Sequence, residues 1–231
     1  MDFDGTISKI DVGEALFKEF GNKELTNNII IDLLDDKISA RECWTQLCEN
    51  TGSVNIKKWD KSIDNIEIEP SFHLFYEYCK KHDFDLFILS DGFDYYIEKI
   101  LNREKLSQIK FFSNKLSITS KGFLVPSFPY FNEYCRSTAN CKRTHIIENS
   151  SESDYTVFIG DGNSDKDPIE FVDFIFAKDD LLKYCEKQRI TYFPYKDFFD
   201  VIKKLKELNS KKRLKKRHQA ELKRREAYLV E

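Results

Sequence analysis

Two nearly continuous runs of apolar residues, each ending in aspartate and glycine, limit the folds open to this chain. The first run extends from Phe84 to Leu89 and leads into Ser90-Asp91-Gly92. The second extends from Tyr155 to Ile159 and leads into Gly160-Asp161-Gly162. Such runs are typical of strands buried on both faces, as in a parallel sheet covered by helices. We therefore expect polar side chains to gather where these strands end.

Segments with helical spacing separate the strands. A further buried run extends from Phe174 to Ala177, and residues 109–134 predict a strand and a hairpin with its turn at Lys121-Gly122. Strands that alternate with helices, with functional groups at the strand ends, predict an α/β fold with a doubly wound, Rossmann-like parallel sheet. The helical segments that support this interpretation are residues 94–101, 143–149 and 181–188.

The first six residues, Met1-Asp2-Phe3-Asp4-Gly5-Thr6, place two carboxylates, a glycine and a hydroxyl together. If Asp2 ends a strand, Asp2 and Asp4 point the same way, because strand side chains alternate. Gly5 lets the chain turn and its backbone approach a ligand. A phosphoryl site needs such groups, since one carboxylate can attack, another can move a proton, and their charge can hold Mg²⁺. A surface turn is the alternative from these residues alone.

Four motifs in order resemble those of the haloacid dehalogenase-like phosphatases. They are Asp2-Phe3-Asp4-Gly5-Thr6, Ser90-Asp91-Gly92, Lys142, and the segment from Gly160 to Asp165. The resemblance extends from residue 1 to about residue 207 and therefore includes most of the chain. It implies a phosphatase, that is, a phosphoric monoester hydrolase, which uses Mg²⁺ and forms an aspartyl-phosphate intermediate.

The resemblance also implies a role for each motif residue. Asp2 corresponds to the nucleophile, and Asp4 to the group that protonates the leaving alkoxide and then deprotonates water. Mg²⁺ would be held by Asp2, by the backbone carbonyl of Asp4 and by Asp161. Asp165 would support the metal or anchor Lys142, which would neutralise the nucleophile and the transferring group. The phosphate-binding residues would be Thr6, Ser90, Asp91, Gly92 and Lys142.

The residues after the first motif have helical spacing as far as about residue 67, and Ser39-x-x-Glu42 predicts a capping box within them. By resemblance, residues 12–67 form a helical cap inserted after the first strand, and 1–11 with 68–208 form the phosphatase core. Asp11 and Glu14, where the chain enters the cap, are candidates for substrate contact. Residues 209–231 would form a basic, helical C-terminal extension.

Several stretches resemble one branch of this superfamily. The branch contains the methionine-salvage 2-hydroxy-3-keto-5-methylthiopentenyl-1-phosphate phosphatases and relatives that act on phosphoserine or phosphocholine-type esters, so a small phosphorylated metabolite is the expected substrate. Two features depart from the pattern: Thr138 stands where the methylthiopentenyl group often has a cysteine, and Ser164-Asp165 stands where phosphoserine phosphatases usually have Asn-Asp. The stretches that carry the resemblance are 11–14, 90–97, 141–142, 160–165 and 174–184.

Charge divides the chain into an acidic body and a basic tail. From Lys203 onward there are 12 Lys and Arg against four Asp and Glu, whereas the first 202 residues hold 25 basic against 36 acidic residues. A solvated helical extension is one interpretation of the tail. The other is a basic patch for nucleic acid, an anionic membrane or an acidic partner, and the tail run lacks the interleaved aromatic residues of a base-stacking platform. A non-catalytic binding protein that uses this tail is the alternative to an enzyme.

The remaining features predict a cytoplasmic protein. The six cysteines form no CxxC pair, and neither a signal peptide nor an apolar run long enough to span a bilayer is present. The start of the chain carries a further expectation. In this fold the opening aspartate ends a strand of about five residues, yet only Met1 precedes Asp2. We therefore expect the natural chain to begin upstream with a short apolar run, a trimmed or inactive form being the alternative.

Overall fold

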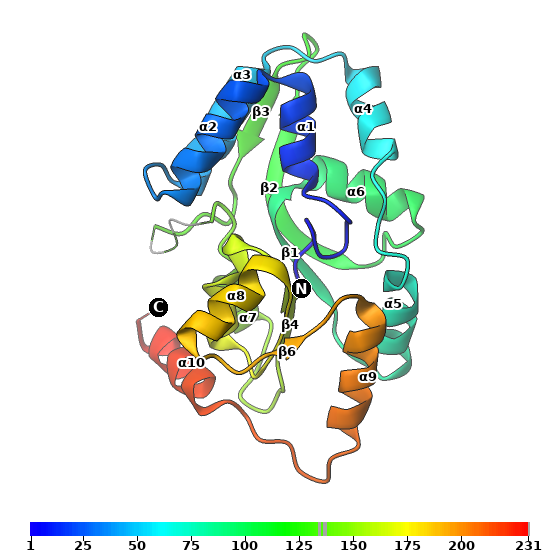
Figure 1. The fold of residues 1–231 in the computed structure, drawn as a ribbon, viewed down its shortest axis with the longest axis vertical. Helices are drawn as coiled ribbons and strands as arrows, with labels where there is room; N and C mark the ends of the chain where they lie inside the picture. Colours follow the sequence, from blue (N-terminus) through cyan, green and yellow to red (C-terminus); the bar gives the residue numbers. More distant parts are fainter. Residues whose placement is uncertain (134, 136–137, 231) are drawn as a thin grey trace. The chain divides into compact units, whose positions relative to one another are not determined.

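The structure, a computed structural model, describes residues 1–133, 135 and 138–230 and contains two compact units (Figure 1). The first unit consists of Met1–Ile7, Ile68–Phe87 and Lys142–Glu231, and the second of Ser8–Glu67 and Ile88–Cys141. The segment predicted as the cap, 12–67, lies within the second unit. The predicted division into core, cap and tail stays a prediction.

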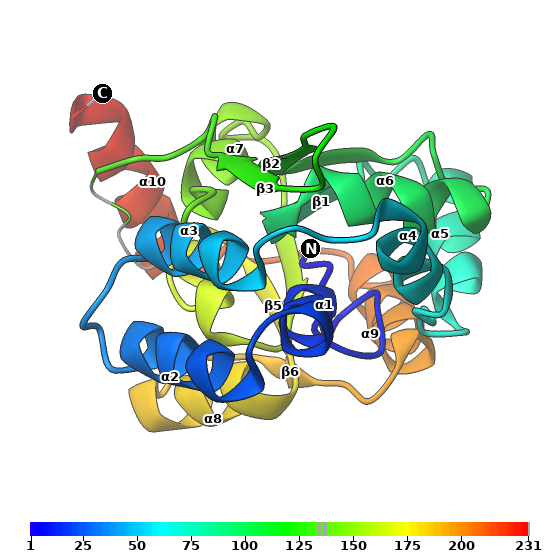
Figure 2. The ribbon, with the colours of Figure 1, turned by 90° about the horizontal axis from the view of Figure 1, so that it is seen from above.

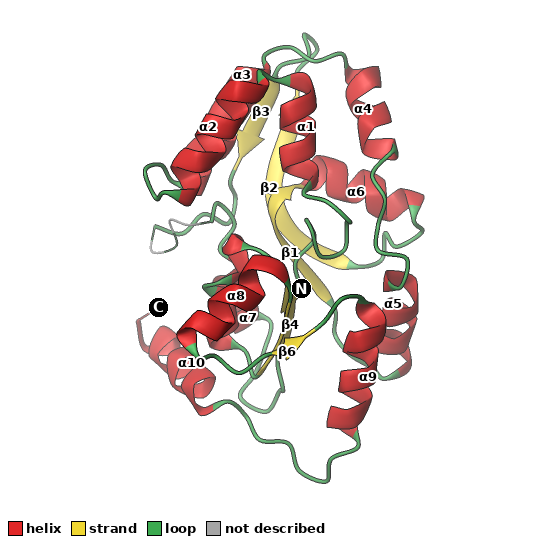
Figure 3. Ribbon diagram, viewed as in Figure 1, coloured by secondary structure: helices red, strands yellow, loops and turns green. Residues whose placement is uncertain are grey.

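The first unit contains a parallel sheet in the order β4-β5-β6 (Figure 3). Val157 pairs with Phe174, and Phe176 pairs with Phe193. The strands and the helices around them lie close to the predicted segments. They are α5 (Phe72–Lys81), α7 (Lys142–Glu148), β4 (Val157–Gly160), η1 (Asn163–Asp165), η2 (Pro168–Phe171), β5 (Phe174–Ala177), α8 (Asp179–Gln188), β6 (Phe193–Pro194), α9 (Phe198–Asn209) and α10 (His218–Val230).

The opening residues lie beside β4 without forming an assigned strand. The backbone N–H of Asp2 donates to the carbonyl of Ile159 at 2.9 Å, and the nitrogen of Met1 donates to the carbonyl of Phe87 at 2.9 Å. Phe3 is fully buried. Asp2 therefore lies next to the carboxyl end of β4. Residues 1–3 are not assigned as a strand, so the strand that we considered as ending at Asp2 is not formed by these residues.

The C-terminal helix packs on the first unit. Ala220 is completely buried, and the Arg224 guanidinium donates to the carbonyl of Phe171 at 2.6 Å and lies 3.3 Å from the Asp173 carboxylate. Arg217 donates to the carbonyl of Ile169. The interpretation of the tail as a solvated extension is therefore wrong for these residues, because its basic side chains find buried acceptors that lie some 50 residues earlier in the chain.

The second unit combines helices with the sheet β1-β2-β3, in which β2 and β3 pair antiparallel (Figure 2). The predicted hairpin is confirmed: Gly122, at φ +85°, turns the chain between β2 and β3. The predicted capping box is also confirmed, with Ser39 and Glu42 bonded reciprocally. The elements are α1 (Val12–Phe20), α2 (Lys23–Leu34), α3 (Ala40–Thr51), α4 (Ile56–Asp64), β1 (Phe87–Phe93), α6 (Asp94–Arg103), β2 (Lys110–Ile118) and β3 (Leu124–Ser127).

An aromatic cluster forms the centre of the second unit. The ring of Phe17 lies 5.8 Å from Trp44, 6.0 Å from Trp59 and 6.3 Å from Phe93, measured between centroids. These four residues come from α1, α3, α4 and β1, so the packing of their large rings helps to hold the helices on the sheet. Among the described residues, no helix is both long enough and apolar enough to cross a membrane.

Candidate active site

Lys142, the first residue of α7, lies at the centre of a buried polar cluster in the first unit. Its Nζ donates to Oδ1 of Asp2 at 2.7 Å, to Oδ1 of Asp165 at 2.6 Å and to Oγ of Ser164 at 2.8 Å. The Lys142 side chain has no exposed surface. Burial lowers its pKa, but the adjacent Asp165 and Asp2 carboxylates outweigh burial and raise it overall, so the ammonium is charged.

The Asp165 carboxylate links the loop after β4 to the Lys142 ammonium. Its Oδ2 accepts hydrogen bonds from the backbone N–H of Asp161 at 3.0 Å and of Gly162 at 3.2 Å, while its Oδ1 binds Lys142. Gly160 makes the close approach possible, because an added Cβ there would lie 2.3 Å from Oδ2 of Asp165. The predicted anchoring of Lys142 by Asp165 is therefore present in the geometry.

Three carboxylates meet beside Lys142. Asp2, Asp161 and Asp165 each offer an oxygen, and these oxygens lie within 4.8 Å of one another. Burial, and then the charge of Asp165, raises the pKa of Asp2 well above its ordinary value and that of Asp161 to about 7. One ammonium does not balance three carboxylates. Mg²⁺ binds hard oxygen ligands, and the negative charge of these carboxylates exceeds the positive charge of Lys142, so these residues fit that ion.

The turn after Asp2 completes this cluster. Thr6 donates from Oγ1 to Oδ1 of Asp161 at 2.6 Å, and Gly5 takes φ +73° because an added Cβ would lie 2.4 Å from Oδ2 of Asp161. Asp4 lies in the same turn, half-buried, and its charge contributes to the raised pKa of Asp2. The six predicted residues of this unit are thus brought together: Asp2, Asp4, Thr6, Lys142, Asp161 and Asp165.

The second unit holds the other predicted phosphate-binding residues, at the end of β1. Oγ of Ser90 accepts a hydrogen bond from the N–H of Gly92 at 2.9 Å. The Asp91 carboxylate accepts from the N–H of Ala139 at 2.6 Å and of Asn140 at 2.8 Å. These bonds fix the backbone of the Ser-Asp-Gly turn. That this turn binds phosphate stays a prediction.

The two residues proposed for substrate contact also lie in the second unit and have local partners. Asp11 is the N-cap of α1, since its Oδ1 accepts from the N–H of Glu14 at 2.7 Å. The Glu14 carboxylate forms an ion pair with Lys18 one helical turn later. Asp11 and Glu14 therefore stabilise the start of α1, and their contact with a substrate stays a prediction.

Sequence reasoning missed two residues of the cluster. The hydroxyl of Tyr195 lies 3.3 Å from the carbonyl of Gly160 and 3.5 Å from Oγ1 of Thr6. Ser164 was noted only as a departure from a motif, yet its hydroxyl binds Lys142. Tyr195 follows β6 directly, so the strand-end rule that selected Asp161 could have found it.

Comparisons with known proteins show which family the chain resembles in sequence. A family model described as "Putative Phosphatase" matches residues 1–185. Pdp3-interacting factor 1 of Schizosaccharomyces pombe is 30% identical over 218 residues, which cover 90% of this chain and 93% of that protein. A 2-hydroxy-3-keto-5-methylthiopentenyl-1-phosphate phosphatase of Bacillus mycoides is 28% identical over 213 residues, which cover 90% and 94%.

Solved structures share the fold. A phospho-aspartyl intermediate analogue of phosphoserine phosphatase matches with a TM-score of 0.65 at 20% identity and covers 88% of this chain and 95% of that chain. A phosphoserine phosphohydrolase-like protein of Francisella tularensis matches with a TM-score of 0.66 at 15% identity over 88% and 97%. These likenesses and the sheet topology confirm the predicted Rossmann-like α/β class. The chain belongs to the "Putative Phosphatase" family and is a haloacid dehalogenase-like phosphatase.

Proposed function

We propose that this phosphatase hydrolyses a small phosphorylated metabolite in two steps, with Asp2 as nucleophile and Mg²⁺ as cofactor. The observation that carries the proposal is the fully buried ammonium of Lys142, which holds Oδ1 of Asp2 at 2.7 Å. Among the described residues no other side chain donates a hydrogen bond to Asp2, so its second oxygen is available to attack phosphorus. A carboxylate held in one orientation is pre-organised for transfer.

The two steps use Asp2 and Asp4 in the roles that the family resemblance implies. In the first, the Asp2 oxygen bonds to phosphorus while the ester P–O bond breaks, and Asp4 donates its proton to the leaving alkoxide. In the second, water attacks the phosphorus, Asp4 takes the proton of that water, and the Asp2–phosphorus bond breaks. One group can serve both steps because they are the reverse of each other in proton demand. Thr6, Ser90, Asp91, Gly92 and Lys142 are proposed to bind the phosphoryl oxygens.

The proposed metal ligands are Asp2, Asp161 and Asp165, with the backbone carbonyl of Asp4. When bound there, Mg²⁺ supplies positive charge that offsets the charge of the transferring phosphoryl group. Lys142 contributes a second positive charge on the protein itself. Since the acids outnumber this cation in the cluster, we expect that Lys142 alone does not support turnover.

The similarity to phosphatases named for 2-hydroxy-3-keto-5-methylthiopentenyl-1-phosphate supports that ester as the first substrate to test. These proteins are 25–28% identical to this chain over about nine tenths of its length. The phosphoserine phosphatases share the fold at 20% identity or less, which supports no choice of substrate.

A phosphate-release assay with the full chain tests the proposal. The panel contains an aryl phosphate, the methylthiopentenyl phosphate, phosphoserine and phosphocholine, each with Mg²⁺ and with EDTA. We expect turnover only with Mg²⁺, and the highest kcat/KM for the methylthiopentenyl ester. A higher kcat/KM for phosphoserine or phosphocholine would change the substrate assignment. No turnover of any ester by a folded, Mg²⁺-supplied protein would favour the non-catalytic alternative and overturn the proposal.

A further inference from the structure

A row of aromatic rings lies at the amino end of the first unit's sheet. Tyr155, Phe174 and Phe193, here called the aromatic row, have ring centroids 6.3 and 6.5 Å apart between successive members, with interplanar angles of 33° and 22°. The row is open to solvent at one end, because Tyr155 is 47% exposed and the neighbouring Val157 is 37% exposed. Phe174 and Phe193 are half-buried. Tyr155, at the exposed end of the row, therefore offers part of its ring surface to a ligand.

A run of basic side chains follows α9. Lys211, Lys212, Arg213 and Lys215 are exposed in the non-helical segment between α9 and α10, here called the basic segment (210–217; Figure 1). Within the described part of the chain, no carboxylate lies within ion-pair distance of these four side chains. Their charge is therefore available to an external anion.

The fold brings the basic segment to the aromatic row. The hydroxyl of Tyr155 donates to the carbonyl of Leu214 at 3.2 Å, although the two residues are 59 apart in the sequence. Lys216 lies with its Nζ 5.4 Å from the centroid of the Tyr155 ring, and Lys204 with its Nζ 4.8 Å from the centroid of Phe193. Cations therefore lie at both ends of the row.

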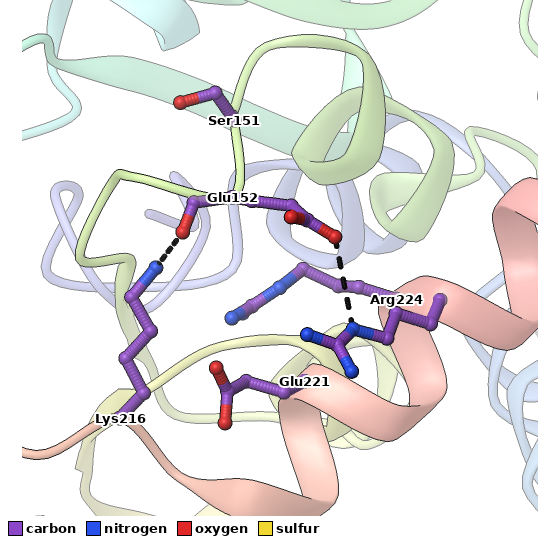
Figure 4. A pocket seen from close by; sticks show the side chains of 6 residues that line it. Ser151, Glu152, Lys216, Glu221 and Arg224 are labelled. Atoms are coloured by element: carbon purple, nitrogen blue, oxygen red, sulfur yellow. Dashed lines mark hydrogen bonds and ion pairs between the residues drawn. The ribbon is translucent and has the colours of Figure 1, made fainter.

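The far end of the basic segment is held in place by contacts with the first unit. A polar pocket lies where α10 meets the turn at Ser151 and Glu152, and in it Lys216 donates to the carbonyl of Glu152 (Figure 4). The Glu152 carboxylate lies 3.6 Å from Arg225. Arg224 is bound to Asp173, so α10 anchors the segment. The exposed positive charges of the segment are thus those of Lys211, Lys212, Arg213 and Lys215.

We propose that the aromatic row and the basic segment together bind single-stranded nucleic acid. Single strands combine a charged backbone with bases that stack on aromatic faces, and this surface offers partners for both. A symmetric contact with a second copy would bring two basic segments together, which like charges disfavour. Attraction to an anionic membrane or an acidic protein would use the lysines but has no need of a row of rings on a sheet.

Fluorescence anisotropy with the full chain and a labelled 12-nucleotide single-stranded DNA tests the proposal. The oligonucleotide carries no terminal phosphate, so that it does not present a monoester to the active site. We expect saturable binding at low salt. The logarithm of the association constant should fall linearly with the logarithm of the salt concentration, with a slope of about −3 if four phosphates are contacted. A duplex of the same sequence, heparin and phosphatidylserine vesicles serve as competing ligands.

Two matched pairs of variants separate the charge from the rings. Lys211→Gln with Lys212→Gln should weaken binding and reduce the salt slope by about 1 to 2, whereas Lys57→Gln with Lys58→Gln, two exposed lysines of α4, should change neither. Tyr155→Leu should weaken single-strand binding about 5- to 100-fold, and Tyr155→Phe should retain it because the ring remains. Circular dichroism confirms the fold of each variant.

Three outcomes would overturn the proposal. One is no saturable binding of the single strand at low salt. Another is equal binding of single strand, duplex and heparin with no effect of Tyr155→Leu, which would show a polyanion surface without base stacking. The third is binding of phosphatidylserine vesicles that depends on Lys211 and Lys212 while the oligonucleotide does not compete, which would assign the surface to a membrane.

Discussion

The Nζ of Lys142 lies 2.6 Å from Oδ1 of Asp165, and neither side chain has any exposed surface. Because the other oxygen of Asp165 binds the backbone N–H of Asp161, this ion pair fixes the start of α7 to the loop after β4. A buried pair of this kind adds little net stability, but removing one partner leaves the other charge unpaired and is costly. Lys142 is therefore a structural element as well as a proposed catalytic one.

Replacing Lys142 with methionine should destabilise the fold and impair transfer together. The variant keeps the length of the side chain but leaves Asp2 and Asp165 without their cation, at a cost of about 3–5 kcal/mol in the free energy of unfolding. Urea unfolding and turnover at a temperature where the variant is folded measure the two effects. Lys183→Met is the control, since Lys183 forms an exposed pair with Asp180. If Lys142→Met unfolded at the same urea concentration as the wild type, the ion pair of Lys142 with Asp165 would not be important for stability.

The two aspartates of the first motif should respond differently to amide substitution. Asp2→Asn deletes the proposed nucleophile at constant volume, so turnover should be lost while the fold is retained. Asp4→Asn removes the acid and base, and should slow turnover of an alkyl phosphate by about 10²- to 10⁴-fold. An aryl ester, whose leaving group needs less protonation, should be affected less in the first step. If the turnover of Asp2→Asn were within a few-fold of that of the wild type, Asp2 would not be the nucleophile.

Mg²⁺ should stabilise the protein more at pH 8 than at pH 6. Burial and the charge of Asp165 raise the pKa of Asp161 from 3.8 to about 7. The folded state thus holds this proton more tightly than the unfolded chain, so in metal-free protein the contribution of Asp161 to stability is lost as the pH rises from about 4 through 7. Mg²⁺ binds the ionised carboxylate and competes with the proton, which gives it more effect at high pH.

Thermal unfolding with Mg²⁺ and with EDTA, at both pH values, measures this linkage. The difference in Tm between the two conditions should be larger at pH 8, and Asp161→Asn should reduce the dependence of that difference on pH. Equal Mg²⁺-induced shifts in the wild type at pH 6 and pH 8 would show that Asp161 does not titrate in this range or does not hold the metal.

Gly5 and Gly162 form a matched pair for testing the acid cluster. Gly5→Ala introduces a Cβ 2.4 Å from Oδ2 of Asp161 at a φ of +73°, so Asp161 must move and Mg²⁺ binding should weaken. Gly162→Ala meets no atom within 4 Å and has an extended backbone with φ −118°. Calorimetric titration with Mg²⁺ compares them. Equal Mg²⁺ affinity of the two alanine variants would argue against Asp161 as a ligand.

The parts of the site that sequence could predict are those encoded locally. Asp161 follows a buried strand directly, and the glycines beside it permit the turn, so its position at a sheet edge follows from pattern. The capping box of Ser39 and Glu42 involves residues three apart and was equally readable. Lys142 could be selected only by its place between two motifs, because nothing in its neighbours marks it among the many lysines of the chain.

The parts that sequence could not predict depend on pairs far apart in the chain. Asp173 and Arg224 are 51 residues apart, and no periodicity links a lone aspartate before β5 to an arginine in a basic tail. Tyr155 and Leu214 meet in the same way. The high net positive charge of the tail suggested that it is solvated. Whether one of its side chains is buried depends instead on whether the fold provides a hydrogen-bond acceptor for it.

Arg224 should be essential for stability, whereas its neighbour Arg225 should not. The Arg224 side chain is 7% exposed and binds Asp173, which has no exposed surface. Arg224→Ala therefore removes an ion-pair partner from a buried carboxylate that still accepts hydrogen bonds from Thr156 and from the N–H of Arg217, at a cost of about 3 kcal/mol. Arg225 is 63% exposed and its partner Glu152 is 77% exposed, so Arg225→Ala should leave the free energy of unfolding nearly unchanged. Urea unfolding of the two variants measures the difference.

Thr156 and Asp173 lie at the amino ends of β4 and β5, whereas Asp161 follows the carboxyl end of β4, so turnover of folded Arg224→Ala should stay near that of wild type. A fall in turnover under conditions where this variant is fully folded would show that α10 also supports the loop from Asp161 to Asp165.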